Sequence, residues 1–342
     1  MAEENRFETI SKRFEKTVKP KLVIDKIGEI KRIIAAMDGT SKSQICLELG
    51  KRLSQRYKTH TKFLRIKRYG AHLLDYIYTT KLAAERNLEE IRDKLAPEPG
   101  FKAEINLISG VPPEKAQDLI EAALKESGGA LGLLIKEIED FRPDLVILPV
   151  PFAEESEIGE EVGEDSLGTA LDLILRRTSR SIPFLLVEGE SLVSRRNVLC
   201  VFNPEQQAES VKITLIHALK LADAGSDVTL LGIIDPILVE TFAGVLGEVS
   251  KEEPDFSKAK NGLKLRMEHL LEAIQLKIEK KVNLKRKVAF GRTDEVLKAT
   301  IAETDAGLIV YQSKYVPHDP LDSMADEIAR HESQVPVLIV WE

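Results

Sequence analysis

The chain has 342 residues, of which 43% are hydrophobic and 31% are charged, and its formal net charge is −7. This length predicts two domains, since one core usually serves about 100 to 200 residues, and the negative charge argues against unspecific nucleic-acid binding, which requires clustered cations. The sequence shows neither an apolar run of roughly 18 residues for a membrane span nor a signal-peptide core, so we expect a cytoplasmic protein that binds neither nucleic acid nor membrane.

The first half of the chain alternates strand and helix patterns after a charged leader at residues 1–29. The leader spaces its apolar residues as a helix does, at Phe7, Ile10, Phe14 and Val18. Strands are predicted at residues 33–37, 61–69, 103–108, 144–150 and 182–188. Helices are predicted at residues 42–57, 72–95, 114–124, 133–141 and 169–179. Several of these strands are uninterrupted apolar runs, which is typical of parallel sheets covered on both faces.

The second half repeats this order of elements. Strands are predicted at residues 197–202, 227–234, 284–291, 306–312 and 335–341, and helices at 209–225, 263–281, 294–304 and 323–332. Residues 240–262 are predicted to be a flexible insertion. When the two halves are aligned, "IIAAMD" of the first matches "VLCVFN" of the second, "DLVIL" matches "AGLIV", and "IPFLLV" matches "VPVLIV".

This repetition predicts an α/β protein with two tandem doubly wound domains, each a five-stranded parallel sheet flanked by helices. The first domain is predicted to span residues 30–190 and the second residues 195–342, with a seam near Glu188 to Arg196. Ligands of such sheets bind beyond the carboxyl ends of the strands, where the strand order reverses. The loops that follow the strands are therefore the segments in which to look for a site.

Three strand-end loops of the first half carry candidate site residues. Asp38 follows the first strand and could accept hydrogen bonds from an adenine amino group or a ribose hydroxyl, although a turn or helix-cap aspartate explains it equally well. Gly110 ends the third strand, where it would let a ring approach the backbone or would simply form a turn. Gly168 and Thr169 open a helix whose free N–H groups favour an anion, and a plain helix cap is the alternative.

The segment before this helix opposes an anion. Between Glu154 and Asp165 there are seven carboxylates and no basic residue. Each carboxylate would repel a nearby phosphate by roughly 1 kcal/mol in water and by more in a shielded site. Only a bridging Mg²⁺ would reverse the sign of this interaction. The alternative is an acidic lid or insertion that lies in solvent.

Little else in the sequence indicates chemistry. Cys46 and Cys200 stand in apolar patterns and are predicted to be small buried residues. The six histidines have no metal-ligand spacing, so no metal site is predicted. The basic run "KIEKKVNLKRKVAFGR" lacks interleaved aromatic residues and is interpreted as a solvated helix end and strand edge, rather than as a surface for nucleic acid or an acidic partner.

From about Lys31 to the C-terminus, the chain resembles a tandem universal stress protein. The segment "GTALDLILRRTSRSIPFLLV" is similar to that family's closing pattern of a glycine and hydroxyl residue, an amphipathic helix and a last apolar strand. "IIAAMDGTSKS" resembles its first strand and the loop after it, and "DLVILP" its fourth strand. The resemblance implies a Rossmann-like fold of the adenine nucleotide alpha-hydrolase type in each half. It also implies that the last strands of the two halves pair within the chain.

Some members of this family bind ATP through a Gly-x-x-Gly-x9-Gly-Ser/Thr loop after the fourth strand and an aspartate after the first. By resemblance, Asp38 matches the aspartate, Gly110 the glycine after the third strand, and Gly168 with Thr169 the end of the loop. The first two loop glycines are missing, because Pro149 to Phe152 stand in their place, and proline removes a backbone donor. In the second half Asn203 and Asp322 replace the aspartate and the last glycine.

These observations predict a non-catalytic stress-response or regulatory protein. Its first half would bind adenine nucleotide weakly at most, as ATP with Mg²⁺, and its second half would be degenerate. Two alternatives stay open: a nucleotide-independent adaptor or scaffold that binds a protein partner through the acidic loop and the leader, and a slow ATPase. A homodimer of chains is compatible with the sequence.

Overall fold

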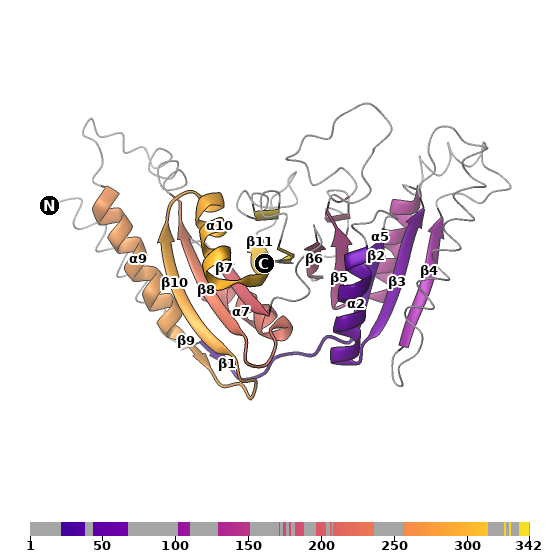
Figure 1. Cartoon of the computed structure of the whole chain (residues 1–342), viewed down its shortest axis with the longest axis horizontal. Helices are drawn as coiled ribbons and strands as arrows, with labels where there is room; N and C mark the ends of the chain where they lie inside the picture. The colour runs from indigo at the N-terminus through magenta and orange to yellow at the C-terminus, as the bar shows by residue number, and fades with distance from the viewer. Residues whose placement is uncertain are drawn as a thin grey trace, which may run out of the picture.

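A computed structural model describes residues 22–37, 44–67, 102–109, 129–150, 182–187, 196–202, 208–235, 256–313 and 335–341, together with a few single positions between them. In this part of the chain the strands form one ten-stranded sheet and one two-stranded sheet (Figure 1). No helix in these residues is both long and apolar enough to cross a membrane.

The first half supplies five parallel strands in the order β4-β3-β2-β5-β6. They are β2 (Arg32–Met37), β3 (His60–Lys67), β4 (Lys102–Ser109), β5 (Leu145–Pro149) and β6 (Phe184–Val187). The described helices of this half are α2 (Gln44–Tyr57) and α5 (Gly129–Phe141). They connect successive parallel strands, as the alternation of elements in the sequence predicted.

The second half follows the same path, in the order β10-β8-β7-β11-β12. Its strands are β7 (Asn197–Phe202), β8 (Asp227–Ile234), β10 (Asn283–Phe290), β11 (Ala306–Ser313) and β12 (Val337–Trp341). Its helices are α7 (Ala208–Leu221), α9 (Phe256–Ala273) and α10 (Thr293–Thr304). Because the first strand of each half lies between its second and fourth strands, both halves are doubly wound, and the predicted fold class is confirmed.

The two halves meet at their last strands, which pair antiparallel. Val337 lies opposite Leu186, and Ile339 lies opposite Phe184. This is the pairing between "IPFLLV" and "VPVLIV" that the family resemblance implied. Neighbouring strands rotate by roughly 20–25°, so the twist over ten strands accumulates to about half a turn. The edge strands β10 and β4 therefore point to the same side of the molecule although the central strands are antiparallel (Figure 1).

Apolar side chains cover both faces of the sheet and form two clusters, each of which includes residues from both halves. On β2, Ile34 and Ala36 belong to one cluster, and Ile33 and Ala35 belong to the other. Alternation along a strand sends successive side chains to opposite faces, which explains why the strands read as continuous apolar runs. Cys46 and Cys200 are fully buried, as predicted, and burial raises the pKa of the Cys200 thiol.

Two segments differ from the prediction. The predicted helix at 263–281 ends at Ala273, where the chain becomes a short strand, β9 (Ile274–Leu276). That strand pairs in parallel with β1 (Leu22–Ile24), which comes from the predicted leader. In addition, residues 256–262, predicted to belong to a flexible insertion, form the start of α9. Ile24 and Ile274 are both buried in one core cluster, so tertiary contacts decide the conformation at this point.

Candidate functional site

The four predicted site residues, Asp38, Gly110, Gly168 and Thr169, lie outside the described residues, and so do Asn203 and Asp322 of the second half. The structure nevertheless describes the strands that precede the first two of them. β2 ends at Met37, directly before Asp38 in the chain, and β4 ends at Ser109, directly before Gly110.

The strand order reverses between β2 and β5. From β2 the chain passes to β3 on one side and later returns to β5 on the other, so the carboxyl ends of β2 and β5 form the switch point at which doubly wound sheets bind ligands. Ala35 lies opposite Ile147 two residues before these ends. β4 is separated from β2 by β3, about 10 Å away at the usual spacing of strands.

The helix that is predicted to begin at Thr169 is described at a few positions. Leu171, Ile174 and Leu175 have helical backbone and pack into the core. Their spacing of three and four residues places them on one helical face. The Thr178 hydroxyl donates to the Ile174 carbonyl at 2.7 Å within the last turn. The apolar positions of the helix read from the sequence are therefore buried between the acidic segment and β6.

At the switch point of the second half, between β7 and β11, two glutamines bridge the strand ends. The Gln206 amide, which follows β7, donates to the backbone carbonyl of Gln312 in β11 at 2.7 Å. The Gln312 amide donates in turn to the Trp341 carbonyl in β12 at 3.3 Å. Protein side chains thus lie across the edge at which a ligand would enter. Sequence reasoning missed both glutamines, because neither belongs to a motif.

A buried aspartate ends the next strand of this half. Asp235 follows β8, and its carboxylate accepts hydrogen bonds from the backbone N–H of Thr293 at 3.0 Å and from the Thr293 hydroxyl at 3.1 Å. Thr293 is the first residue of α10. A carboxylate at a helix N-terminus accepts a hydrogen bond from a free N–H group and interacts favourably with the positive end of the helix dipole. We therefore assign Asp235 the role of a helix cap.

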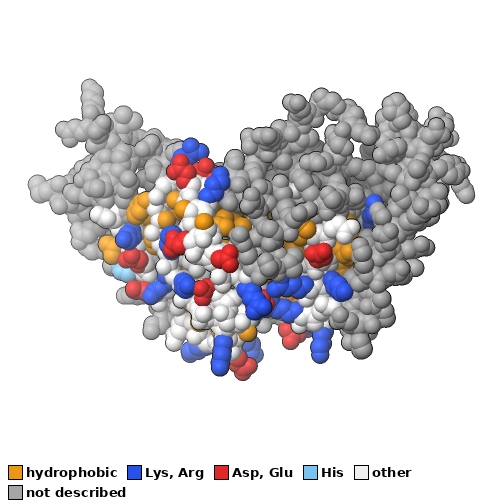
Figure 2. All heavy atoms as spheres, viewed as in Figure 1, with side chains coloured by type: hydrophobic (Ala, Val, Ile, Leu, Met, Phe, Trp, Pro, Cys, Tyr) orange, Lys and Arg blue, Asp and Glu red, His pale blue; other side chains and the backbone are white. Residues whose placement is uncertain are grey.

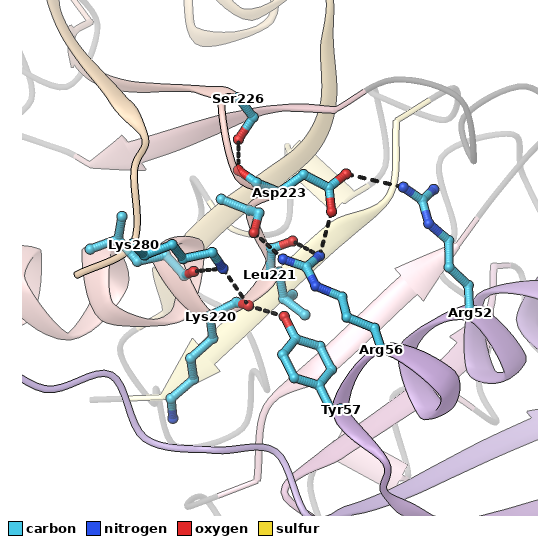
Figure 3. Close-up of polar contacts among 10 residues, drawn as sticks. Arg52, Arg56, Tyr57, Lys220, Leu221, Asp223, Ser226 and Lys280 are labelled. Carbon is cyan, nitrogen blue, oxygen red and sulfur yellow. Dashed lines mark hydrogen bonds and ion pairs between the residues drawn. The ribbon is translucent and has the colours of Figure 1, made fainter. Parts of the chain in front are cut away.

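Near the amino ends of the strands, on the side opposite the switch points, α2 of the first half contacts the C-terminus of α7 of the second (Figure 3). We call this contact the α2–α7 junction, and it comprises Arg52, Arg56 and Tyr57 from α2, residues 219–223 at the end of α7, and Lys280. The last carbonyls of a helix have no partners within it and carry partial negative charge. Cationic side chains from other elements are therefore favourable there.

The donors of the junction reach four successive carbonyl groups. Arg56 donates to the carbonyls of Leu221 (2.9 Å) and Ala222, and Tyr57 donates through its hydroxyl to that of Lys220. The Lys280 ammonium donates to the carbonyls of residue 219 at 2.7 Å and of residue 220 at 3.3 Å. These contacts leave none of the carbonyls from residue 219 to residue 222 without a side-chain donor.

Asp223 is the acidic residue of the junction. Its carboxylate lies 2.7 Å from Arg56 and 3.2 Å from Arg52. The pKa of Lys280 is lowered to about 8, chiefly by burial and also by the nearby Arg56, while Asp223 opposes the change. Burial also raises the pKa of Tyr57. The junction is a structural contact between the halves, and it lies away from the strand ends that form the candidate site.

Two lysines of the basic run form ion pairs with neighbouring elements. Lys285 forms an ion pair with Asp227 at 2.5 Å, and Lys287 forms one with Glu303 at 2.5 Å. Figure 2 shows positive and negative side chains interspersed over the described surface of the second half. In this region neither positive nor negative side chains predominate. Among the described residues, no three histidine, cysteine, aspartate or glutamate side chains gather as a metal site would require.

No protein-family model and no curated protein matches the chain. Solved structures are similar to it over most of its length. A universal stress protein from Archaeoglobus fulgidus is 15% identical, covers 91% of this chain and 98% of its own, and has a TM-score of 0.52. A putative universal stress protein from Pseudomonas aeruginosa is 11% identical over 91% and 93% of the two chains, with a TM-score of 0.51.

A protein of unknown function from Pseudomonas aeruginosa is 10% identical over 91% and 92% of the two chains, with a TM-score of 0.50. At these identities the likeness shows a shared fold. The similarity extends through both halves of this chain, because each match covers nine tenths of it. The fold implied by the sequence resemblance is therefore the fold that the chain has.

Proposed function

We propose that the chain is a non-catalytic regulatory protein of the universal stress protein family, and that its first half binds adenine nucleotide weakly, as ATP with Mg²⁺. One observation carries this proposal: two doubly wound halves joined through their last strands share their fold with universal stress proteins over nearly the whole chain. The switch point of the first half is followed directly by Asp38, a residue that suits a nucleotide.

In this proposal Asp38 accepts hydrogen bonds from the nucleoside, Gly110 allows its close approach, and Gly168 with Thr169 provide donors to a phosphate. Two features keep the binding weak. Pro149 ends β5 without a backbone donor, and the carboxylates of residues 154–165 repel the phosphates unless Mg²⁺ lies between them. The second half binds no nucleotide, because Gln206 bridges its switch point.

Calorimetric titration with ATP tests this assignment. We expect a saturable heat with a dissociation constant of about 0.1 to 1 mM in the presence of Mg²⁺, and its loss on adding EDTA. Asp38→Ala should weaken binding by about tenfold or more, which corresponds to about 1.4 kcal/mol. Asp140→Ala, at an exposed position of α5, should bind as the wild type does. The absence of any heat at millimolar nucleotide would remove the proposal.

Hydrolysis is a separate question. We propose that the chain is not an enzyme, so phosphate release from ATP should not exceed that of a protein-free control. A slow release that Asp38→Ala abolishes and Asp140→Ala preserves would instead assign a slow ATPase to this site. Release that is unchanged in Asp38→Ala would indicate a contaminating activity.

A nucleotide-independent adaptor is the second candidate, and the glutamine contacts across the switch point of the second half favour it. Such an adaptor would bind its partner through the acidic segment at residues 153–165 and the leader. Truncation of the leader should stop at residue 21, because residues 22–24 form β1 within the fold. A partner that is captured equally well without residues 1–21 and 153–165 would contradict this candidate.

A further inference from the structure

One strand of the sheet differs from the others in its exposure. β10 is the last strand of the sheet on the side of the second half (Figure 1). Each of its eight residues is exposed or partly exposed, whereas β2, β7, β8 and β11 are mostly buried. Its pairing with β8 is regular over all eight residues. An edge strand of this length presents a row of backbone N–H and carbonyl groups to any strand that approaches.

The side chains of β10 divide between the two faces of the sheet. Lys285 and Lys287 point to one face, where they form ion pairs with Asp227 and Glu303. By alternation, Leu284, Arg286, Val288 and Phe290 share the other face, where Val288 packs against a core cluster. Leu284 and Phe290 are each 37% exposed, and they are two of the four large exposed apolar side chains in the described residues. The second face therefore exposes one cation, Arg286, next to Leu284, and a second exposed apolar side chain, Phe290, at the end of the strand.

We propose that β10 binds an extended acidic segment of another protein, which adds a strand to this edge of the sheet. Backbone hydrogen bonds would supply affinity, and alternate side chains of the added strand would supply specificity. The preferred segment carries a carboxylate opposite Arg286 and apolar residues toward Leu284 and Phe290. The charge of the strand favours this partner, because Arg286 is exposed and β10 has no acidic residue, whereas Lys285 and Lys287 already pair with Asp227 and Glu303.

A second copy of the chain fits this edge less well. If two β10 strands paired with each other, cations of one strand would face cations of the other, and like charges directly opposite each other are destabilising. Charges on edge strands also serve to prevent pairing altogether. The proposal and this protective role make opposite predictions about an acidic peptide.

The test uses two synthetic nine-residue peptides that alternate valine and threonine, one with glutamate at the centre and one with lysine there. Fluorescently labelled peptide is titrated with the full chain at low salt, and binding is followed by anisotropy. We expect the glutamate peptide to bind the wild-type protein and Arg286→Glu to weaken it by about tenfold or more. The lysine peptide should bind Arg286→Glu more tightly than it binds the wild-type protein. Lys136→Glu, an equal charge change at an exposed position of α5, should leave both affinities unchanged.

Hydrogen exchange locates the bound peptide. We expect the glutamate peptide to slow exchange of the amides of β10 and to leave those of β3 in the first half unchanged. Failure of the glutamate peptide to bind the wild-type chain would show that the charges protect the edge, and it would overturn the proposal. Equal binding to Arg286→Glu, or binding without protection of β10, would overturn it as well. Neither result would bear on nucleotide binding by the first half.

Discussion

At the scale of single residues, Gly50 shows how a missing side chain positions α2. A Cβ atom at this position would lie 2.8 Å from Cε1 of Phe63 and 3.0 Å from Cβ of Ala35. Both neighbours belong to the sheet on which α2 packs and are fully buried. The glycine therefore lets the helix approach β2 and β3 closely, and it supports the part of the sheet that ends at the switch point of the first half.

Gly50→Ala should lower the free energy of unfolding by about 1 to 3 kcal/mol, because overpacking outweighs the gain in helix propensity. Gly262→Ala is the matched control, since Gly262 lies within α9 and its added Cβ would meet no atom within 4 Å. That change should stabilise the protein by about 0.5 to 1 kcal/mol. Urea unfolding measures both, and a stabilised Gly50→Ala variant would contradict the close packing.

His217 links stability to acidic pH. Burial, with a smaller effect of Lys220, lowers its pKa from 6.5 to about 4. The unfolded chain therefore binds a proton at higher pH than the folded chain does, and the free energy of unfolding should fall as pH decreases from about 6.5 toward 4. His217→Gln should reduce this loss. His269→Gln, at an exposed position of α9, should keep the wild-type profile when urea midpoints are compared at pH 7 and pH 4.5.

At the scale of elements, hydrophobic patterns predicted the described strands of the large sheet to within a few residues. Continuous apolar runs such as those of β5 and β7 bury both faces, so their pattern reflects the final environment. The pattern failed at α9 and β9, where a helical period runs through Ile274. A three-residue partner strand from far away in the chain determines that boundary, and no local signal could indicate it.

The sequence predicted the candidate site only in part, for the same reason. The strands that precede Asp38 and Gly110 in the chain were predicted correctly, and the order of strands gives the positions of the strand ends, whereas the roles of the two residues stay predictions. The Gln206–Gln312 contact and the α2 donors of the α2–α7 junction involve backbone carbonyls more than 100 residues away from the donor. Such acceptors are present at every residue, so the sequence contains no pattern that distinguishes them.

The α2–α7 junction predicts unequal roles for two neighbouring arginines. Arg56→Met would leave the carbonyls of Leu221 and Ala222 without their donor, and it should cost about 1 to 3 kcal/mol of unfolding free energy. The Arg52 side chain is 37% exposed and donates to Asp223 in this junction, so Arg52→Met should cost about 0.2 to 1 kcal/mol. Urea unfolding of both variants shows which substitution costs more unfolding free energy. An equal loss in the two variants would contradict the capping role of Arg56.

At the scale of the whole molecule, the described residues join the two halves at two places, and the leader adds a third contact with the second half. β6 pairs with β12 in the middle of the sheet, the α2–α7 junction joins helices of both halves, and β1 pairs with β9 before the chain enters the first half. Both core clusters contain side chains of both halves. Because β6 and β12 pair with each other, a dimer of chains would have to use another surface.

These contacts predict that the two halves unfold together. Trp341 is the only tryptophan of the chain, and its indole N–H donates to the Ile182 carbonyl of the other half at 3.0 Å. Its side chain is 8% exposed, so its fluorescence reports on the boundary between the halves, whereas far-ultraviolet circular dichroism reports on all helices and strands. Independent halves would lose ellipticity in two steps, only one of which would coincide with the change in fluorescence. We expect instead one transition in urea with the same midpoint for both probes, and a first step in ellipticity at unchanged fluorescence would contradict the coupling.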